Sequence, residues 1–171
     1  IGLDSVDLLE AKKQGITVSY TPDTPAPAVA ELTIGLMLTL LRSIHLSNIE
    51  MHNGKWHRFF GRRLSEVTIG IVGVGRIGKR VLHHLKGFAT PKILVNDISP
   101  DETIDEIFDI TWVEKDEIYQ QADIVTIHTP LTKQTKNLVK EEQLFCMKED
   151  AIIINTARGG IINEQDLYEV M

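Results

Sequence analysis

The sequence predicts an α/β fold with a doubly wound parallel sheet, because short β-branched segments alternate with helical segments from residue 67 onward. The expected strands lack the apolar–polar alternation of half-exposed strands, which is typical of parallel strands covered by helices on both faces. They are residues 67–72, 93–96, 123–127 and 151–154. The helices that separate them are expected at residues 76–86, 114–121 and 140–147.

The first part of the chain predicts a smaller unit followed by a hinge. A short helix is expected over residues 7–14, ended by Gly15, and a strand over residues 16–20. Residues 21–27 carry three prolines, which favour an extended and stiff backbone. This proline-rich segment is therefore the best candidate for a domain boundary.

One continuous long helix is predicted over residues 28–51, and its apolar side chains cover most of its circumference. Such a helix must be buried on most sides, either within the core of its own domain or partly against a second subunit. The longest apolar run, residues 34–41, is far shorter than the roughly 20 residues that cross a bilayer.

Composition narrows the class of protein further. The formal charge of −6, from 18 basic and 24 acidic residues, argues against a nucleic-acid or membrane-surface partner. The lone cysteine, Cys146, excludes an internal disulfide and fits a reducing compartment, and we expect its thiol to be buried. No metal site is predicted. The chain opens on Ile1 and stops at Met171 within a helical pattern, so we expect a piece of a longer protein.

A glycine pattern follows the strand that starts at residue 67 and opens the next helix. In that context Gly73 permits a tight turn, Gly75 lets a pyrophosphate approach the backbone, and Gly78 lets the helix pack closely on the strand. The helix amides and dipole then face the phosphates. A tight turn with no ligand is the alternative interpretation.

An acid ends the second strand at the distance expected for recognition of a ribose. Asp97 lies about 20 residues past the glycines, where a carboxylate accepts hydrogen bonds from both ribose hydroxyls and repels a 2′-phosphate. No Arg or Lys occurs in residues 98–100. These observations predict NAD as the cofactor in preference to NADP.

Two further strand ends are polar and rich in turn residues, namely residues 128–132 and 155–160. Ligands of open α/β sheets bind at the carboxyl ends of the strands. Arg158 places a permanent cation just past a buried strand, where a guanidinium grips a carboxylate with two parallel hydrogen bonds. A salt bridge to a nearby acid is the alternative role for this side chain.

These motifs, in this order, resemble the D-isomer-specific 2-hydroxyacid dehydrogenases, a family that includes D-3-phosphoglycerate dehydrogenase. The likeness runs from Gly2 to about Leu167. It is carried by residues 4–7, 15–18, 28–32, 54–56, 68–78, 128–132 and 155–164.

The resemblance implies a Rossmann NAD-binding domain and a role for each matching residue. It implies that Arg158 is catalytic, binding the substrate carboxylate and helping to polarise the carbonyl that takes hydride. The cofactor-binding residues that it implies are Gly73, Gly75, Arg76, Ile77, Gly78 and Asp97 on the pyrophosphate and ribose, His128, Thr129 and Pro130 on the adenosine side, and Thr156 and Ala157 on the nicotinamide half.

The resemblance also implies an organisation. Residues 1–20 would be a remnant of the edge of the substrate domain, and residues 21–171 a dinucleotide-binding domain truncated at its C-terminal end. The catalytic His and Glu of the family would lie beyond Met171, so the fragment is predicted inactive, and His128 is no substitute. The helix over residues 28–51 would form a homodimer interface.

The activity implied is oxidation of a D-2-hydroxy acid to a 2-oxo acid with NAD, in a cytoplasmic enzyme, with D-3-phosphoglycerate as one candidate substrate. Two alternatives stay open. One is an NAD-sensing binding module of the corepressor kind, and the other is a formate or phosphonate dehydrogenase built on the same domain.

Overall fold

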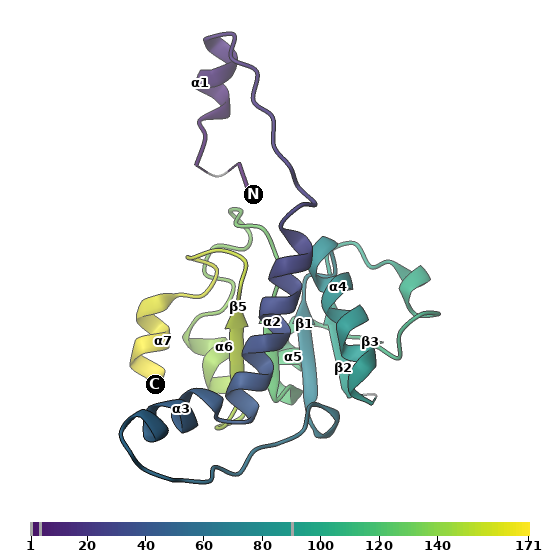
Figure 1. Ribbon diagram of the computed structural model, residues 1–171. Helices are drawn as coiled ribbons and strands as arrows, with labels where there is room; N and C mark the ends of the chain where they lie inside the picture. The colour runs from purple at the N-terminus through teal and green to yellow at the C-terminus, as the bar shows by residue number, and fades with distance from the viewer. Residues whose placement is uncertain (1, 4, 90) are drawn as a thin grey trace.

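The computed structural model describes residues 2–3, 5–89 and 91–171. Within these ranges five parallel strands form one sheet in the order β3-β2-β1-β4-β5 (Figure 1). They are β1 (Thr68–Val72), β2 (Lys92–Asn96), β3 (Thr111–Trp112), β4 (Ile124–Ile127) and β5 (Ile152–Asn155). Because the chain moves outward from β1 in one direction and then in the other, the predicted doubly wound class is confirmed.

Helices cover both faces of the sheet (Figure 1). α2 (Ala26–Leu41) and α4 (Arg76–Leu85) share one hydrophobic core with the sheet, and α5 (Lys115–Gln121) and α6 (Glu141–Cys146) share the other. The other helices of the described ranges are α1 (Leu8–Lys13), α3 (Ile44–His52) and α7 (Glu164–Val170), with 3-10 turns at Leu64–Glu66, Lys86–Phe88 and Glu102–Ile104.

The central strand alternates its side chains between the two cores. Ile69 and Ile71 lie in the core beside α2 and α4, whereas Val72 lies in the core beside α5. Gly70 leaves no room for a side chain on the α5 side, because a Cβ there would lie 2.3 Å from Cγ2 of Ile118. Burial on both faces explains why this strand is apolar without alternation.

The predicted continuous helix over residues 28–51 is wrong, because the structure divides it into α2 and α3 with a 65° bend. Arg42 leaves the helical conformation and Ser43 is left-handed with φ of 50°, which ends α2. Among the described residues no single helix is long and apolar enough to cross a membrane, and α2 and α3 reach that length and composition only as a bent pair.

The predicted strand over residues 16–20 is also wrong. These residues form a coil between α1 and α2, and none of the described strands pairs with them (Figure 1). A strand needs a hydrogen-bonded neighbour, which this segment lacks within the described ranges. The predicted extended backbone over residues 21–27 is also wrong, because residues 22–25 form bends and a turn in which the N–H of Ala26 donates to the Asp23 carbonyl at 3.1 Å. α2 begins at Ala26, and Pro27 lies in its first turn, where a missing N–H is tolerated.

The helix predicted over residues 140–147 is shorter in the structure and places its cysteine differently. α6 ends at Cys146, which is exposed, so the prediction of a buried thiol is wrong. Leu144 is the buried residue of this helix, and the side chain two positions later points to another face.

Candidate cofactor site

The carboxyl ends of four neighbouring strands, β2, β1, β4 and β5, lie side by side. Their register aligns Val72 with Asn96 and with Ile127, and Ile127 in turn with Asn155. The residues that follow these strand ends therefore form a row that is roughly 14 Å long, three inter-strand spacings. All the predicted site residues lie along this row.

The three glycines that follow β1 have three different surroundings. Gly73 has φ of +98°, and a Cβ there would lie 2.9 Å from the carbonyl of His128. Gly78 lies against the turn, because its Cβ would be 2.2 Å from the Gly73 carbonyl oxygen. A Cβ on Gly75 would meet no atom within 4 Å, so this residue borders open space. The geometry at Gly73 and Gly78 fits the predicted turn and packing roles, and the open space at Gly75 leaves room for a pyrophosphate, whose approach there stays a prediction.

The open space at Gly75 lies at the start of α4. Arg76 and Ile77 open this helix, and its N-cap residue, Gly75, carries no side chain that could cap it. The first N–H groups of a helix have no partner within the helix and carry a partial positive charge. This helix start is therefore suited to the phosphates of a dinucleotide.

Asp97 follows β2 and hydrogen-bonds back to the glycine turn. Its Oδ2 accepts the N–H of Val74 at 2.7 Å, and its Oδ1 accepts the N–H of Ser99 at 3.0 Å. Each oxygen keeps a second lone pair that could accept a ribose hydroxyl. A pocket of about 580 Å³ lies here, lined by the glycine turn, Asp97 and residues 99–101.

Two cationic side chains, Arg76 and Lys79, lie at the pocket. Arg76 and Lys79 of α4 line it together with Asp97. Nε of Arg76 lies 2.6 Å from a carboxylate oxygen of Asp23, and Nζ of Lys79 lies 2.5 Å from one of Asp101. Residues 98–100 carry no cation, as the sequence shows, but α4 brings Lys79 to the same pocket, and the sequence analysis did not consider that side chain.

The residues that follow β4 include two buried polar atoms that no other described residue hydrogen-bonds. Nε2 of His128 lies 3.0 Å from Oγ1 of Thr126, whereas His128 Nδ1 and Thr129 Oγ1 are buried and have no hydrogen-bond partner within the described ranges. Burial lowers the pKa of His128 from 6.5 to about 4, so its ring is neutral at pH 7. Unpaired buried polar atoms are costly, and a bound polar ligand would satisfy these two. Pro130, the next residue, is exposed.

The end of β5 is a turn built by Asn155. The Nδ2 group of Asn155 donates to the carbonyl of Arg158 at 2.7 Å, and its Oδ1 accepts the N–H of Ala157 at 3.1 Å. The Arg158 guanidinium donates to the Ala157 carbonyl, also at 2.7 Å. These bonds fix the turn that carries the predicted catalytic arginine.

Thr33 is a residue of the site region that the sequence reasoning missed. It is fully buried in α2, and its Oγ1 lies 3.1 Å from Oγ1 of Thr156. This contact joins the helix after the hinge to the end of β5. No signal in the sequence singles out Thr33, because α2 also contains Thr39, a second β-branched hydroxyl residue.

A glycine turn that opens a helix, an acid at the next strand end and polar turns at two further strand ends define a dinucleotide-binding domain. Residues 34–171 match the family model described as D-isomer specific 2-hydroxyacid dehydrogenase, NAD binding domain. The chain belongs to this family. Membership confirms the predicted fold, the resemblance and NAD as the cofactor.

The known proteins to which this chain is similar carry the names of reductases and dehydrogenases. A hydroxypyruvate reductase of Thermotoga maritima is 39% identical over 99% of this chain and 55% of its own length. A D-3-phosphoglycerate dehydrogenase of Methanocaldococcus jannaschii is 38% identical over the whole chain and 33% of its own. The D-lactate dehydrogenase of Aquifex aeolicus, solved with NAD and lactic acid, has a TM-score of 0.88 at 32% identity, covering 98% of this chain and 51% of that one. The chain therefore spans about half the length of most of these relatives, or less.

Proposed function

We propose that this chain is the NAD-binding domain, residues 21–171, of an enzyme that interconverts a D-2-hydroxy acid and a 2-oxo acid. Residues 1–20 are proposed to belong to the edge of its substrate domain. The observation that carries this proposal is the turn after β5, where Arg158 lies next to Thr156 and Ala157 at the row of strand ends. NAD, when bound, supplies or accepts the hydride.

In this proposal Arg158 binds the substrate carboxylate. Its guanidinium is partly buried, and the bond to the Ala157 carbonyl fixes it at the turn. A planar guanidinium matches a carboxylate with two parallel hydrogen bonds, a geometry that lysine does not reproduce. The same positive charge stabilises the negative charge that grows on the carbonyl oxygen during reduction.

The proton donor is proposed to come from another part of the protein. His128 is unsuited to the task, because its pKa of about 4 leaves it neutral at pH 7 and its Nε2 contacts Thr126. A positioned acid or base contributes a factor of about 10²–10⁴ to the rate. The 171-residue chain alone is therefore expected to bind NADH and to turn over almost no substrate.

The test has two parts. The chain alone should be stabilised by NADH, by about 2.7 kcal/mol at 100 times the dissociation constant. The longer protein should oxidise at least one of a panel of D-2-hydroxy acids, 3-phosphoglycerate included, and Arg158→Gln should lose far more kcat/KM than an exposed control, Arg63→Gln. Formate belongs in the panel, because a Granulicella formate dehydrogenase has a TM-score of 0.89. Binding of NADH by the longer protein without turnover of any acid would favour the sensing module.

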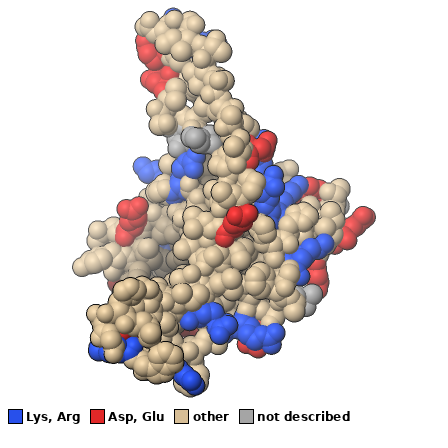
Figure 2. Space-filling model, viewed as in Figure 1, with Lys and Arg blue, Asp and Glu red and all other residues tan. Residues whose placement is uncertain are grey.

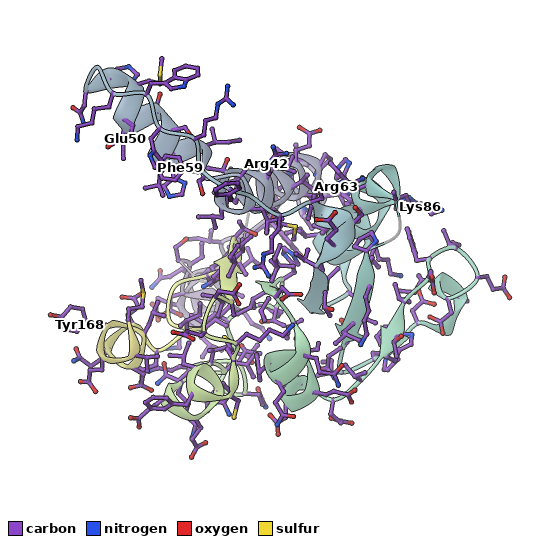
Figure 3. All side chains as sticks on the ribbon, turned by 90° about the horizontal axis from the view of Figure 1, so that it is seen from below. Arg42, Glu50, Phe59, Arg63, Lys86 and Tyr168 are labelled. Carbon is purple, nitrogen blue, oxygen red and sulfur yellow. The ribbon has the colours of Figure 1, made fainter. Side chains whose placement is uncertain are left out.

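We also propose a homodimer. Its interface is proposed on α3 and residues 53–60, here called the arm, in place of the whole of residues 28–51, because α2 packs in the core of its own chain. Figure 3 shows the arm projecting from the body, with Glu50 and Phe59 along it, and α3 has no buried residue. Its exposed apolar side chains include Ile49 at 52%, Trp56 at 76% and Phe60 at 103%. An apolar projection of this kind is typical of a surface covered by a partner.

Charge supports a second copy as that partner. Figure 2 shows basic side chains along the lower edge of this face, near α3 and the segment after it. The arm has two basic residues, Lys55 and Arg58, and one acid, Glu50, so it is slightly basic on a chain with a net charge of −6. Trp56→Ser combined with Phe60→Ser should convert a dimer to a monomer in sedimentation velocity, whereas Phe145→Ser, an exposed apolar residue of α6, should not. A monomeric parent protein would contradict the dimer.

The single cysteine further supports a proposed cytoplasmic location, which cell fractionation would test.

A further inference from the structure

The pocket at Asp97 holds two cations, and both are already paired. Arg76 is held by Asp23, and Lys79 is held by Asp101. Lys79 follows Gly78 on α4, and Asp101 follows the end of β2, so an element on each side of the pocket contributes one partner. A 2′-phosphate on the ribose would bring a charge of about −1.5 to −2 into this space.

We propose that the Lys79–Asp101 ion pair makes Asp101 a specificity residue, because it withholds from a 2′-phosphate the cation that would otherwise bind it. This inference rests on the proposed placement of the adenosine ribose at Asp97. In this account NAD is preferred because the cation in the pocket is neutralised, and not because a cation is absent.

The geometry of Asp101 makes it a persistent partner for Lys79. Besides the ammonium, its carboxylate accepts the N–H of Thr103 at 3.2 Å and the hydroxyl of Thr103 at 2.5 Å. The hydrogen bond from Lys79, aided by Thr103, lowers the pKa of Asp101 to about 2. The carboxylate is therefore charged at pH 7.

Asp97 alone is a weaker barrier to a 2′-phosphate than its position suggests. Both of its oxygens accept backbone N–H groups, from Val74 and Ser99, and these dipoles offset part of its negative charge. A lysine available at the same pocket would offset more. Asp101 removes that compensation, because its carboxylate neutralises Lys79.

The decisive variant is Asp101→Asn, which keeps an oxygen for Thr103 and frees Lys79. The readout is the ratio of the dissociation constants for NADPH and NADH, measured by calorimetry on the chain. We expect Asp101→Asn to lower this ratio about tenfold, which corresponds to about 1.4 kcal/mol. The double variant Asp101→Asn with Lys79→Gln should restore the ratio of the original chain. An unchanged ratio in Asp101→Asn, or an equal fall in the double variant, overturns the proposal.

Two controls separate this effect from others. Glu142→Gln removes an equal charge from an exposed ion pair with Lys140, far along the chain from the pocket, and should leave the ratio unchanged. Lys79→Gln alone leaves Asp101 unpaired and should raise the ratio, and a fall instead overturns the proposal even if Asp101→Asn does not fold. A chain that binds no NADH contradicts the proposed function, whereas tight NADH binding with an unmoved ratio contradicts only this inference.

Discussion

The N–H of Val74 donates to the Oδ2 atom of Asp97 at 2.7 Å, and this bond ties the glycine turn to the end of β2. The acid therefore has a structural role before any ribose is present. Because the turn sets where the first amides of α4 lie, Asp97 links the ribose pocket to the phosphate position.

Asp97→Asn is expected to weaken both binding and folding. An amide offers one oxygen for two N–H groups, so either Val74 or Ser99 would face an NH₂ group. Losing a hydrogen bond to a charged acceptor costs about 1.5–3 kcal/mol. We expect the melting temperature to fall by several degrees and NADH to bind at least about tenfold more weakly. Asp109→Asn, an exposed acid on the same connection, should change neither quantity.

The glycine turn offers a matched pair of substitutions. Gly75→Ala places its methyl in open space, so the free energy of unfolding should stay within about 1 kcal/mol of the original. The same methyl occupies the position where pyrophosphate must approach, and NADH affinity should fall by at least about tenfold. Calorimetric titration and thermal melting measure the two effects separately.

Gly78→Ala, in contrast, should lower the free energy of unfolding. Its Cβ would lie 2.2 Å from the Gly73 carbonyl oxygen, so α4 must move away from the turn. Overpacking of this kind costs about 1–3 kcal/mol, and the melting temperature should fall accordingly. If Gly75→Ala proved the more destabilising of the two, the division of roles between these glycines would be incorrect.

The tight turn at Gly73 and the close packing at Gly78 could be predicted because they depend on a local strand–turn–helix sequence. The pairing of Lys79 with Asp101 could not, because it depends on how α4 packs against the end of β2, 22 residues away along the chain. The break at Ser43 was missed for a different reason. It contains neither Gly nor Pro, and the end of α2 shows only in the backbone angles of Arg42 and Ser43.

Asp123 directly precedes β4, at the end of the sheet opposite the cofactor site, and contacts three groups there. It accepts the N–H of Thr68 at 2.7 Å and is contacted by Lys148 at 3.0 Å and Arg62 at 3.2 Å. Burial raises the pKa of Asp123, but the Thr68 bond, Lys148 and Arg62 outweigh burial and lower it below 3.8. The charged form is thus favoured in the folded state.

Asp123→Asn should therefore destabilise the fold at neutral pH by about 1–3 kcal/mol. Because the folded-state pKa is lowered, the native advantage of the charged form is complete above pH 3.8 and is lost as the pH falls below it. Urea unfolding at pH 7 and pH 3 measures the difference. A gap between Asp123→Asn and the original chain that is as large at pH 3 as at pH 7 would argue against this charge.

The lowered pKa of His128 predicts a second loss of stability in acid, at a higher pH than the loss caused by Asp123. Burial lowers its folded-state pKa to about 4, whereas the unfolded chain has the ordinary value of 6.5. Between these values the unfolded state binds more protons, so the free energy of unfolding must decrease as the pH falls from 6.5 to 4. The difference between these two pKa values sets the full decrease at about 3 kcal/mol.

His128→Gln should remove this decrease, because glutamine does not titrate and can keep a contact with Thr126. Urea unfolding at pH 7 and pH 4.5 should therefore show about 2–3 kcal/mol less acid destabilisation in His128→Gln than in the original chain. His84→Gln, which alters an exposed histidine of α4, should keep the original pH dependence. Parallel pH profiles for His128→Gln and the original chain would show that His128 is protonated in the fold as readily as in water.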